Sequence, residues 1–240
     1  MPQLPGFPPV DITLRRNVRA RRFSLRVSQA DGRVTLSLPA RAREAEAMAF
    51  AAAQEGWIRA ALAKMPVATG VGIGSLIPVE GQMLRLVSGT GRSVQIAQDQ
   101  LIVPGDPARA GARVAAFLKV LARDRLAQAS DHYANQLGRR VTQITLRDTR
   151  SRWGSCTADG SLMYAWRLIM APPQVLRYVA AHEVAHLVEM NHSPAFWAVV
   201  SRLYPNWQAE RLWLKRQGGA LQALSFAPVQ AVPGIDGRAV

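Results

Sequence analysis

Alternating apolar and polar positions near the start of the chain predict a β-hairpin. Residues 23–27 and 34–38 each place a large apolar side chain at every second position, and Ala30-Asp31-Gly32 lies between them. Period-two alternation is typical of a strand with one buried face, and an Asp-Gly pair favours a tight turn. We therefore expect two antiparallel strands joined at this turn.

A helix is expected to follow the hairpin. Trp57, Ile58 and Leu62 recur at near-helical intervals in the alanine-rich range 42–65, and Pro66 cannot continue a helix. This spacing predicts a single helix over the whole range.

Several glycines and short alternating runs in residues 71–105 predict a small antiparallel sheet. Together with the hairpin and the helix, this sheet makes an α+β module. We place this β-rich module with its basic hairpin at residues 11–105, after a leader at residues 1–10.

Residues 106–218 are expected to form a second domain. Asp106-Pro107 resembles an N-cap followed by a first-turn proline, for a helix that ends at Gly138. The other expected elements are strands at 141–147 and 162–170 around a loop at 151–156, a helix from Pro172-Pro173 to about Met190, and helices after Ser193 and Pro205, the last ending near Gly218. Residues 219–240 are expected to be a flexible tail.

The composition is that of an ordinary globular protein, with 49% hydrophobic and 19% charged residues. The longest apolar stretch, residues 47–53, is too short to span a bilayer, and the N-terminus lacks the pattern of a secretory signal. Cys156 is the only cysteine, which excludes an intramolecular disulfide and a multi-cysteine zinc site. We expect a cytoplasmic protein with no membrane partner.

The formal net charge is +14, and six arginines fall between Arg15 and Arg26. Such a cluster can bind nucleotides or nucleic acid, but it also fits an ordinary strand with a solvated face. Binding of nucleotides or nucleic acid through the basic hairpin therefore remains an alternative.

The sequence His182-Glu183-Val184-Ala185-His186 lies inside a range that is predicted to be helical on independent grounds. Residues four apart share a helix face, so both imidazoles can reach one zinc ion at about 2.0–2.1 Å. Glu183 can then take a proton from a zinc-bound water, which makes it the expected catalytic base.

A catalytic zinc site needs a third protein ligand, for which His192, Glu189 and Glu210 are candidates. Three of the four histidines of the chain fall within the eleven residues 182–192, and this favours His192. Its spacing works where the helix ends and the chain folds back. We expect one zinc ion per chain, held by His182, His186 and His192.

Residues near the expected site can contact the substrate, although no spacing rule chooses among them. The loop at 151–156 can line a cleft, and a nearby phenol can stabilise an oxyanion. Cys156 is expected to be a buried, inert thiol. The predicted substrate-binding residues are Arg152, Trp153, Ser155, Tyr164 and Tyr178.

The segment HEVAHLVEMNHSPAFW, preceded by RDTRSRWGSC and followed by YPNWQAERLWLKRQG, resembles the YgjP-like metallopeptidase family, a relative of the SprT-like minimal zincins. The resemblance implies a compact zincin-like domain in which the HExxH helix packs on a small sheet. It also implies His182, His186 and His192 as ligands and Glu183 as base. One departure is Ala165 before Trp166, where the family usually has an asparagine.

The leading hypothesis is a zinc-dependent metallopeptidase that acts on a protein or peptide. The alternative keeps the same site and hydrolyses the phosphoanhydride of a nucleotide, because a fold and a motif do not fix the substrate. Arginines beside the zinc would favour this alternative. A third hypothesis makes the basic hairpin a nucleic-acid docking module.

Overall fold

The computed structural model describes residues 2–28, 32–63 and 69–227. The chain divides into two compact units, Met1–Val67 and Ala68–Val240. This division differs from the expected boundary at residues 105 and 106. The reason is that the strands at 76–104 bury their apolar side chains in the same core as the following helices. The fold class is α+β, as predicted.

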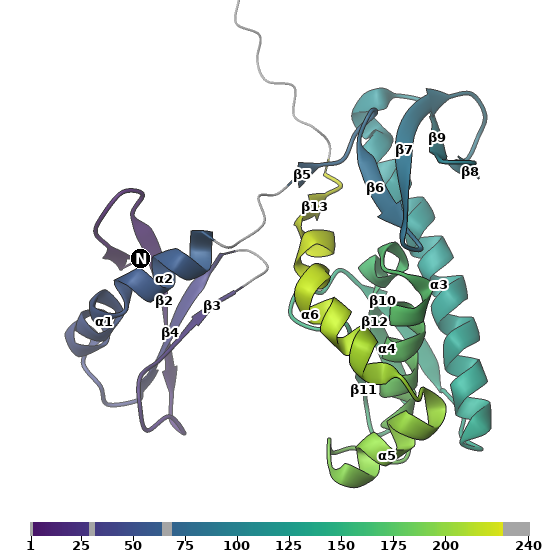
Figure 1. Ribbon diagram of the computed structural model, residues 1–240. Coiled ribbons are helices and arrows are strands. Elements are labelled where there is room, and N and C mark those ends of the chain that lie inside the picture. Colours follow the sequence, from purple (N-terminus) through teal and green to yellow (C-terminus); the bar gives the residue numbers. More distant parts are fainter. Residues whose placement is uncertain (1, 29–31, 64–68, 228–240) are drawn as a thin grey trace, which may run out of the picture. The chain divides into compact units, whose positions relative to one another are not determined.

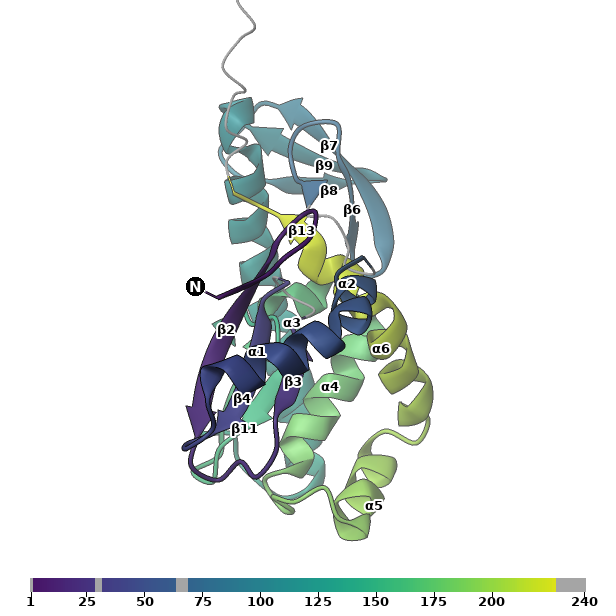
Figure 2. The ribbon, with the colours of Figure 1, turned by 90° about the vertical axis from the view of Figure 1, so that its left-hand side faces the viewer.

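The first unit is a four-stranded sheet with two helices on one face (Figure 2). Leu25 pairs with Leu36, which confirms the hairpin; residues 29–31 of its turn lie outside the described residues. Its elements are β1 (Gln3–Leu4), β2 (Val10–Asn17), β3 (Ser24–Val27), β4 (Val34–Pro39), α1 (Glu44–Ala53) and α2 (Glu55–Ala63), with the strand order β1-β2-β4-β3.

Two predictions for this unit are wrong. The range 42–65 holds two helices, because the backbone of Gln54 leaves the helical conformation at φ −106° and ψ 13°. The leader predicted at residues 1–10 is part of the fold from residue 2 onward, since β1 pairs with β2 and Leu4 is buried in the core.

The second unit begins with a four-stranded sheet that packs against the long helix α3 (Ala110–Gln136). Its strands are β6 (Leu76–Val79), β7 (Gln82–Gly89), β8 (Gln95–Ala97) and β9 (Gln100–Pro104), in the order β6-β7-β9-β8. The prediction of an antiparallel sheet is wrong in one respect. After β7 the chain crosses to the edge of the sheet as β8 and returns as β9, between β7 and β8. Strand β9 is therefore antiparallel to β8 and parallel to β7.

A three-stranded sheet follows α3, with the order β10-β12-β11. Its strands are β10 (Gln143–Arg147), β11 (Gly154–Cys156) and β12 (Ser161–Ala165). The expected loop at 151–156 therefore contains an edge strand. The expected strand at 162–170 ends at Ala165, and a 3-10 helix, η2 (Trp166–Met170), replaces its second half. All five residues of η2 are buried, whereas alternation would bury only every second one.

Helix α4 (Pro173–Ala185) lies between α3 on one side and α6 (Trp207–Ala223) on the other, with α5 (Pro194–Leu203) beyond its C-terminal end (Figure 1). The first proline of α4 is in its first turn, and Ser193 caps α5 by accepting a hydrogen bond from the amide of Phe196, as expected. Among the described residues, the helices are all too short or too polar to cross a membrane.

The C-terminal part is more ordered than predicted. Helix α6 continues past Gly218, and β13 (Leu224–Ser225) pairs with β5 (Thr69–Gly70). The buried guanidinium of Arg167 donates hydrogen bonds to the carbonyl oxygens of Leu221 and Leu224. The flexible tail predicted from residue 219 is therefore wrong as far as residue 227; residues 228–240 lie outside the described part.

Candidate metal centre

The end of α4 and the turn after it bring three histidines together. His182 is in the last turn of α4, His186 caps its C-terminus, and His192 lies just before α5. One ring nitrogen from each lies within 4.8 Å of the other two, and the Nε2 atoms of His182 and His192 are 3.1 Å apart. Helix α4 ends earlier than the predicted Met190, and this early end lets the chain return His192 to the cluster.

Neighbouring groups fix the orientation of His186. Its Nδ1 is 2.9 Å from the carbonyl oxygen of Glu189, which can only accept, so Nδ1 donates and Nε2 keeps a free lone pair. The ring of Phe196 stacks on His186 at 4.4 Å between centroids. Phe196 is fully buried and lies on the apolar face of α5 with Val200 and Leu203. Such a support restricts the ring to one orientation, as metal sites require.

The electrostatics of the cluster favour neutral imidazoles. Burial, and to a smaller extent the neighbouring His186 and His192, lower the pKa of His182 to about 3. Burial also lowers the pKa of His186. Neutral imidazole is the form that coordinates metals, and a tetrahedral zinc ion with ligands at about 2.0–2.1 Å holds its nitrogens roughly 3.3 Å apart. The three nitrogens thus fit a zinc ion.

The other two candidate ligands lie elsewhere. Glu189 contacts His186 through its backbone carbonyl oxygen. The carboxylate of Glu210 accepts a hydrogen bond from the hydroxyl of Tyr204 at 3.4 Å. Cys156 lines the same cavity as the histidines, but its thiol is not part of the cluster of ligand atoms. Burial raises the pKa of Cys156 to about 11, which disfavours the thiolate that binds metals.

Glu183 is buried directly beside the histidines, with 5% of its surface exposed. Burial raises the pKa of Glu183 to about 8, and the positive charge of Arg152 opposes this shift. A cavity of about 230 Å³ is lined by Glu183, the three histidines, the strand β11 and Met190. The acid and the nitrogens therefore face one common space.

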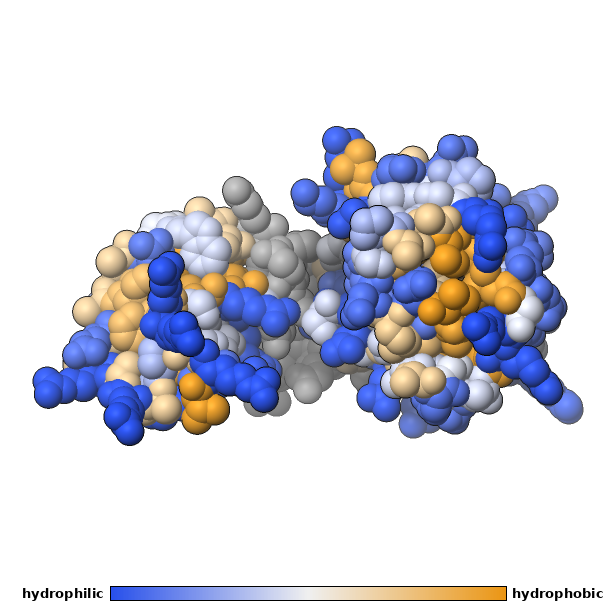
Figure 3. Space-filling model, turned by 90° about the horizontal axis from the view of Figure 1, so that it is seen from below, coloured by the Kyte–Doolittle hydropathy of each residue, from blue (hydrophilic) through white to orange (hydrophobic). Residues whose placement is uncertain are grey.

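Strand β11 borders this cavity with a free edge. Among the described strands it pairs only with β12, to which it is antiparallel. An exposed edge can accept an extended peptide as an additional strand. Exposed apolar residues after α4, Val188 and Met190, lie close to the site. Figure 3 shows hydrophobic residues gathered on the lower surface of the second unit, among hydrophilic ones.

The predicted substrate-binding residues lie in different places. Ser155 lines the histidine cavity, and Trp153 and Tyr178 line an adjoining cavity of about 330 Å³ that also touches Glu183. Arg152 is exposed and acts on Glu183 through its charge. Tyr164 is a correction, because it is fully buried and its hydroxyl is 2.9 Å from that of Ser130. It is part of the core and lines neither of the two cavities.

Sequence reasoning missed the contribution of α6. Arg211, Leu214 and Lys215 line the adjoining cavity together with Trp153 and Tyr178. Their spacing of three and four residues shows that they share a helix face. The contact between α4 and α6 that brings this face to Glu183 is tertiary, so the local pattern could not reveal it.

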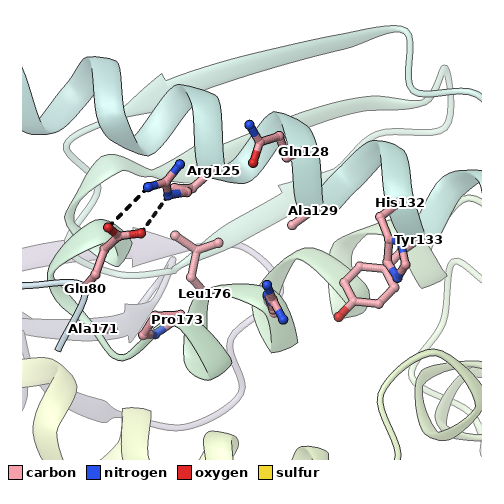
Figure 4. Close-up of a pocket in the computed structure, with 10 residues that line it drawn as sticks. Glu80, Arg125, Gln128, Ala129, His132, Tyr133, Ala171, Pro173 and Leu176 are labelled. Carbon is pink, nitrogen blue, oxygen red and sulfur yellow. Dashed lines mark hydrogen bonds and ion pairs between the residues drawn. The ribbon is translucent and has the colours of Figure 1, made fainter.

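A larger cavity, of about 480 Å³, lies away from the histidine cluster, between α3 and the first turns of α4. Figure 4 shows Glu80 and Arg125 at one end of it, joined by an ion pair of 2.7 Å, and His132 and Tyr133 toward the other. His132, the fourth histidine, is within 2.8 Å of the side-chain nitrogen of Gln136 and takes no part in the metal cluster.

Gly154 provides a test of how Glu183 is held. A Cβ at this position would lie 2.5 Å from Oε1 and 2.6 Å from Cγ of Glu183, so the buried side chain would have to move. We expect Gly154→Ala to lower hydrolytic activity on the order of 100-fold, since small displacements of catalytic groups have such effects. Bound metal should stay unchanged.

The matched control is Gly70→Ala, where an added Cβ meets no atom within 4 Å. It should keep full activity. Equal activity of the two variants in an assay of initial rates would show that Gly154 does not position Glu183.

Family membership defines the class of this protein as a metallopeptidase-type hydrolase. Residues 21–217 match the YgjP-like metallopeptidase domain family, and the chain belongs to this family. It is also similar to the crystal structure of the metallopeptidase zymogen of Pyrococcus abyssi abylysin, with 20% identity, a TM-score of 0.35, and coverage of 38% of this chain and 95% of that chain. No curated protein matches the chain at a significant level.

Proposed function

We propose that the chain is a zinc-dependent peptidase that holds one zinc ion through His182, His186 and His192 and uses Glu183 as the catalytic base. The observation that carries this proposal is the convergence of three imidazoles, with ring nitrogens within 4.8 Å of one another, beside a buried carboxylate. Three nitrogen ligands with an open fourth position are the usual set of a catalytic zinc.

Different groups at the site carry out different parts of the proposed peptide hydrolysis. A zinc ion, when bound, polarises a carbonyl oxygen and makes water acidic enough to attack it near neutral pH. The edge of β11 pairs with the backbone of an extended peptide and presents the scissile bond to the cavity. Glu183 takes the proton of the attacking water and transfers it to the leaving amine. Its burial raises its proton affinity, so it can hold this proton between the two steps.

Removal of the metal tests the proposal. The purified chain should hydrolyse casein or a mixture of peptides, lose this activity after treatment with a chelator, and regain it with about one equivalent of zinc. Mass spectrometry of the products measures the cleavage. A chain that carries zinc but cleaves no peptide in the mixture would contradict the peptidase proposal.

One observation favours a second candidate, the hydrolysis of a nucleotide phosphoanhydride at the same site. Arg211 and Lys215 line the cavity beside Glu183, and cations there could neutralise phosphates. A panel of nucleoside triphosphates is therefore assayed beside the peptides. Release of pyrophosphate without peptide cleavage, lost in Glu183→Gln, would select this candidate. Nucleic-acid binding through the first unit rests on charge alone and stays a prediction.

A further inference from the structure

The cavity beside Glu183 is separate from the histidine cavity. It measures about 330 Å³ and lies between α4, α6 and the start of β11. His182, Glu183 and Gly154 border both cavities, whereas His186 and His192 border the histidine cavity and not the second one. The second cavity therefore opens from the Glu183 side of the cluster.

The proposed mechanism places one part of a peptide substrate on this side. Glu183 delivers a proton to the leaving amine, so the nitrogen of that amine must come within hydrogen-bond reach of its carboxylate. This nitrogen belongs to the residue that follows the scissile bond. The side chain of that residue is then the group closest to the second cavity.

The charges at the cavity are unbalanced. The guanidinium of Arg211 lies 5.3 Å from the ring centre of Trp197 and 5.9 Å from that of Trp207, which hold it by cation–π contacts. Lys215 follows one turn later on α6. Among the described residues, neither cation forms an ion pair or a hydrogen bond with an acid.

Glu183 is the one acid among the lining residues, and in the described part of the chain it forms no ion pair with Arg211 or Lys215. Two positive side chains are therefore available to a ligand.

The walls of the cavity are apolar. Trp153, Tyr178 and Leu214 line it, and Gly218 of α6 lets the Trp153 ring approach closely, because a Cβ there would lie 2.8 Å from Cζ2 of the indole. Apolar walls with cations on one side suit a side chain with a short aliphatic stem and an anionic end.

We propose that this cavity binds the side chain of an aspartate or glutamate that follows the scissile bond, with Arg211 and Lys215 as the residues that determine this specificity. The inference rests on the proposed peptidase function and adds the substrate class to it. A carboxylate bound by an arginine and a lysine forms charge-assisted hydrogen bonds, which are stronger than neutral ones.

Cleavage specificity gives the first test. A peptide mixture of diverse sequence, prepared without trypsin, is digested by the zinc-loaded chain. Mass spectrometry then identifies the residue that follows each cleaved bond. We expect acidic residues at this position to be enriched about 10-fold over their glutamine and asparagine counterparts. Lys215→Glu and Arg211→Glu should lose this preference and favour lysine instead.

Arg216→Glu is the matched control, since Arg216 is an exposed cation on the same helix that does not line the cavity. It changes the net charge by the same amount and should leave the preference intact. An unchanged preference for acids in Lys215→Glu, or its loss in Arg216→Glu, would overturn the proposal.

Binding gives a second test that needs no turnover. Dye-labelled peptides that differ only in a central glutamate, glutamine or lysine are titrated into the zinc-loaded Glu183→Gln variant, with anisotropy as the signal. The glutamate peptide should bind about 10-fold more tightly than the glutamine peptide, and Lys215→Glu in this background should abolish the difference. Equal binding of the three peptides would overturn the proposal.

The two tests separate the failure of this inference from that of the proposed function. Peptide cleavage without a preference for acids would leave the peptidase function and remove the acidic specificity. Tighter binding of the glutamate peptide without any cleavage would keep the pocket for acidic side chains and remove the peptidase function. A nucleoside triphosphate that competes with all three peptides equally would assign the cations to phosphate and overturn the inference.

Discussion

Replacement of Glu183 by glutamine is expected to lower the rate of peptide hydrolysis by about 100- to 10,000-fold, which is the usual contribution of a general acid–base group. Glutamine keeps the size of the side chain but cannot accept the proton of the attacking water. Because Glu183 lies next to the histidines and is not one of the three, bound zinc should stay at about one per chain. Initial rates and the metal content of the same preparation measure the two quantities.

The opposite pattern would contradict the role of Glu183. If the glutamine variant kept most of its activity, another group would have to act as base. If it lost both the activity and the metal, Glu183 would be a ligand or a structural support. Gly154→Ala, which displaces Glu183 without changing it, should resemble a weaker form of Glu183→Gln.

Replacement of His192 by alanine is expected to abolish stable zinc binding. Loss of an outer-shell partner lowers metal affinity by about 10- to 100-fold, and the loss of one of three direct ligands should exceed this range. The Nε2 atom of His192 is 3.1 Å from that of His182, so its removal opens one side of the cluster. Titration with a competing chelator measures the affinity, and the activity should disappear with the metal.

Glu189→Ala and Glu210→Ala are the matched controls for this experiment. Glu189 supports His186 through its backbone carbonyl, which alanine retains. The carboxylate of Glu210 accepts a hydrogen bond from the hydroxyl of Tyr204. Both variants should bind zinc as the natural chain does. Retention of zinc by His192→Ala together with its loss in either glutamate variant would show that a carboxylate is the third ligand.

Local sequence was sufficient to predict the candidate site because its parts are close in the chain. His182 and His186 share a helix face through their spacing, and His192 follows within one short turn. The caps at Asp106 and Ser193 were predictable for the same reason, since each side chain bonds a backbone amide two or three residues away.

Long-range contacts were beyond this reasoning. The boundary between the units depends on which core receives the apolar face of β6–β9, and the parallel pairing of β7 with β9 depends on where β8 lies. Tyr164 was predicted to contact the substrate because a nearby phenol can stabilise an oxyanion, but it is fully buried and its hydroxyl lies 2.9 Å from that of Ser130. The cations of α6 reach Glu183 only because α6 packs against α4.

X-ray absorption at the zinc edge of the purified chain tests the central claim most directly, because it reports the type and number of atoms bound to the metal. The three-histidine site predicts three imidazole nitrogens at about 2.0–2.1 Å and one further oxygen. In His192→Ala, any residual zinc should show one imidazole fewer. A sulfur ligand at about 2.3 Å, which only Cys156 or a methionine could supply, or fewer than three imidazoles in the natural chain, would contradict the account.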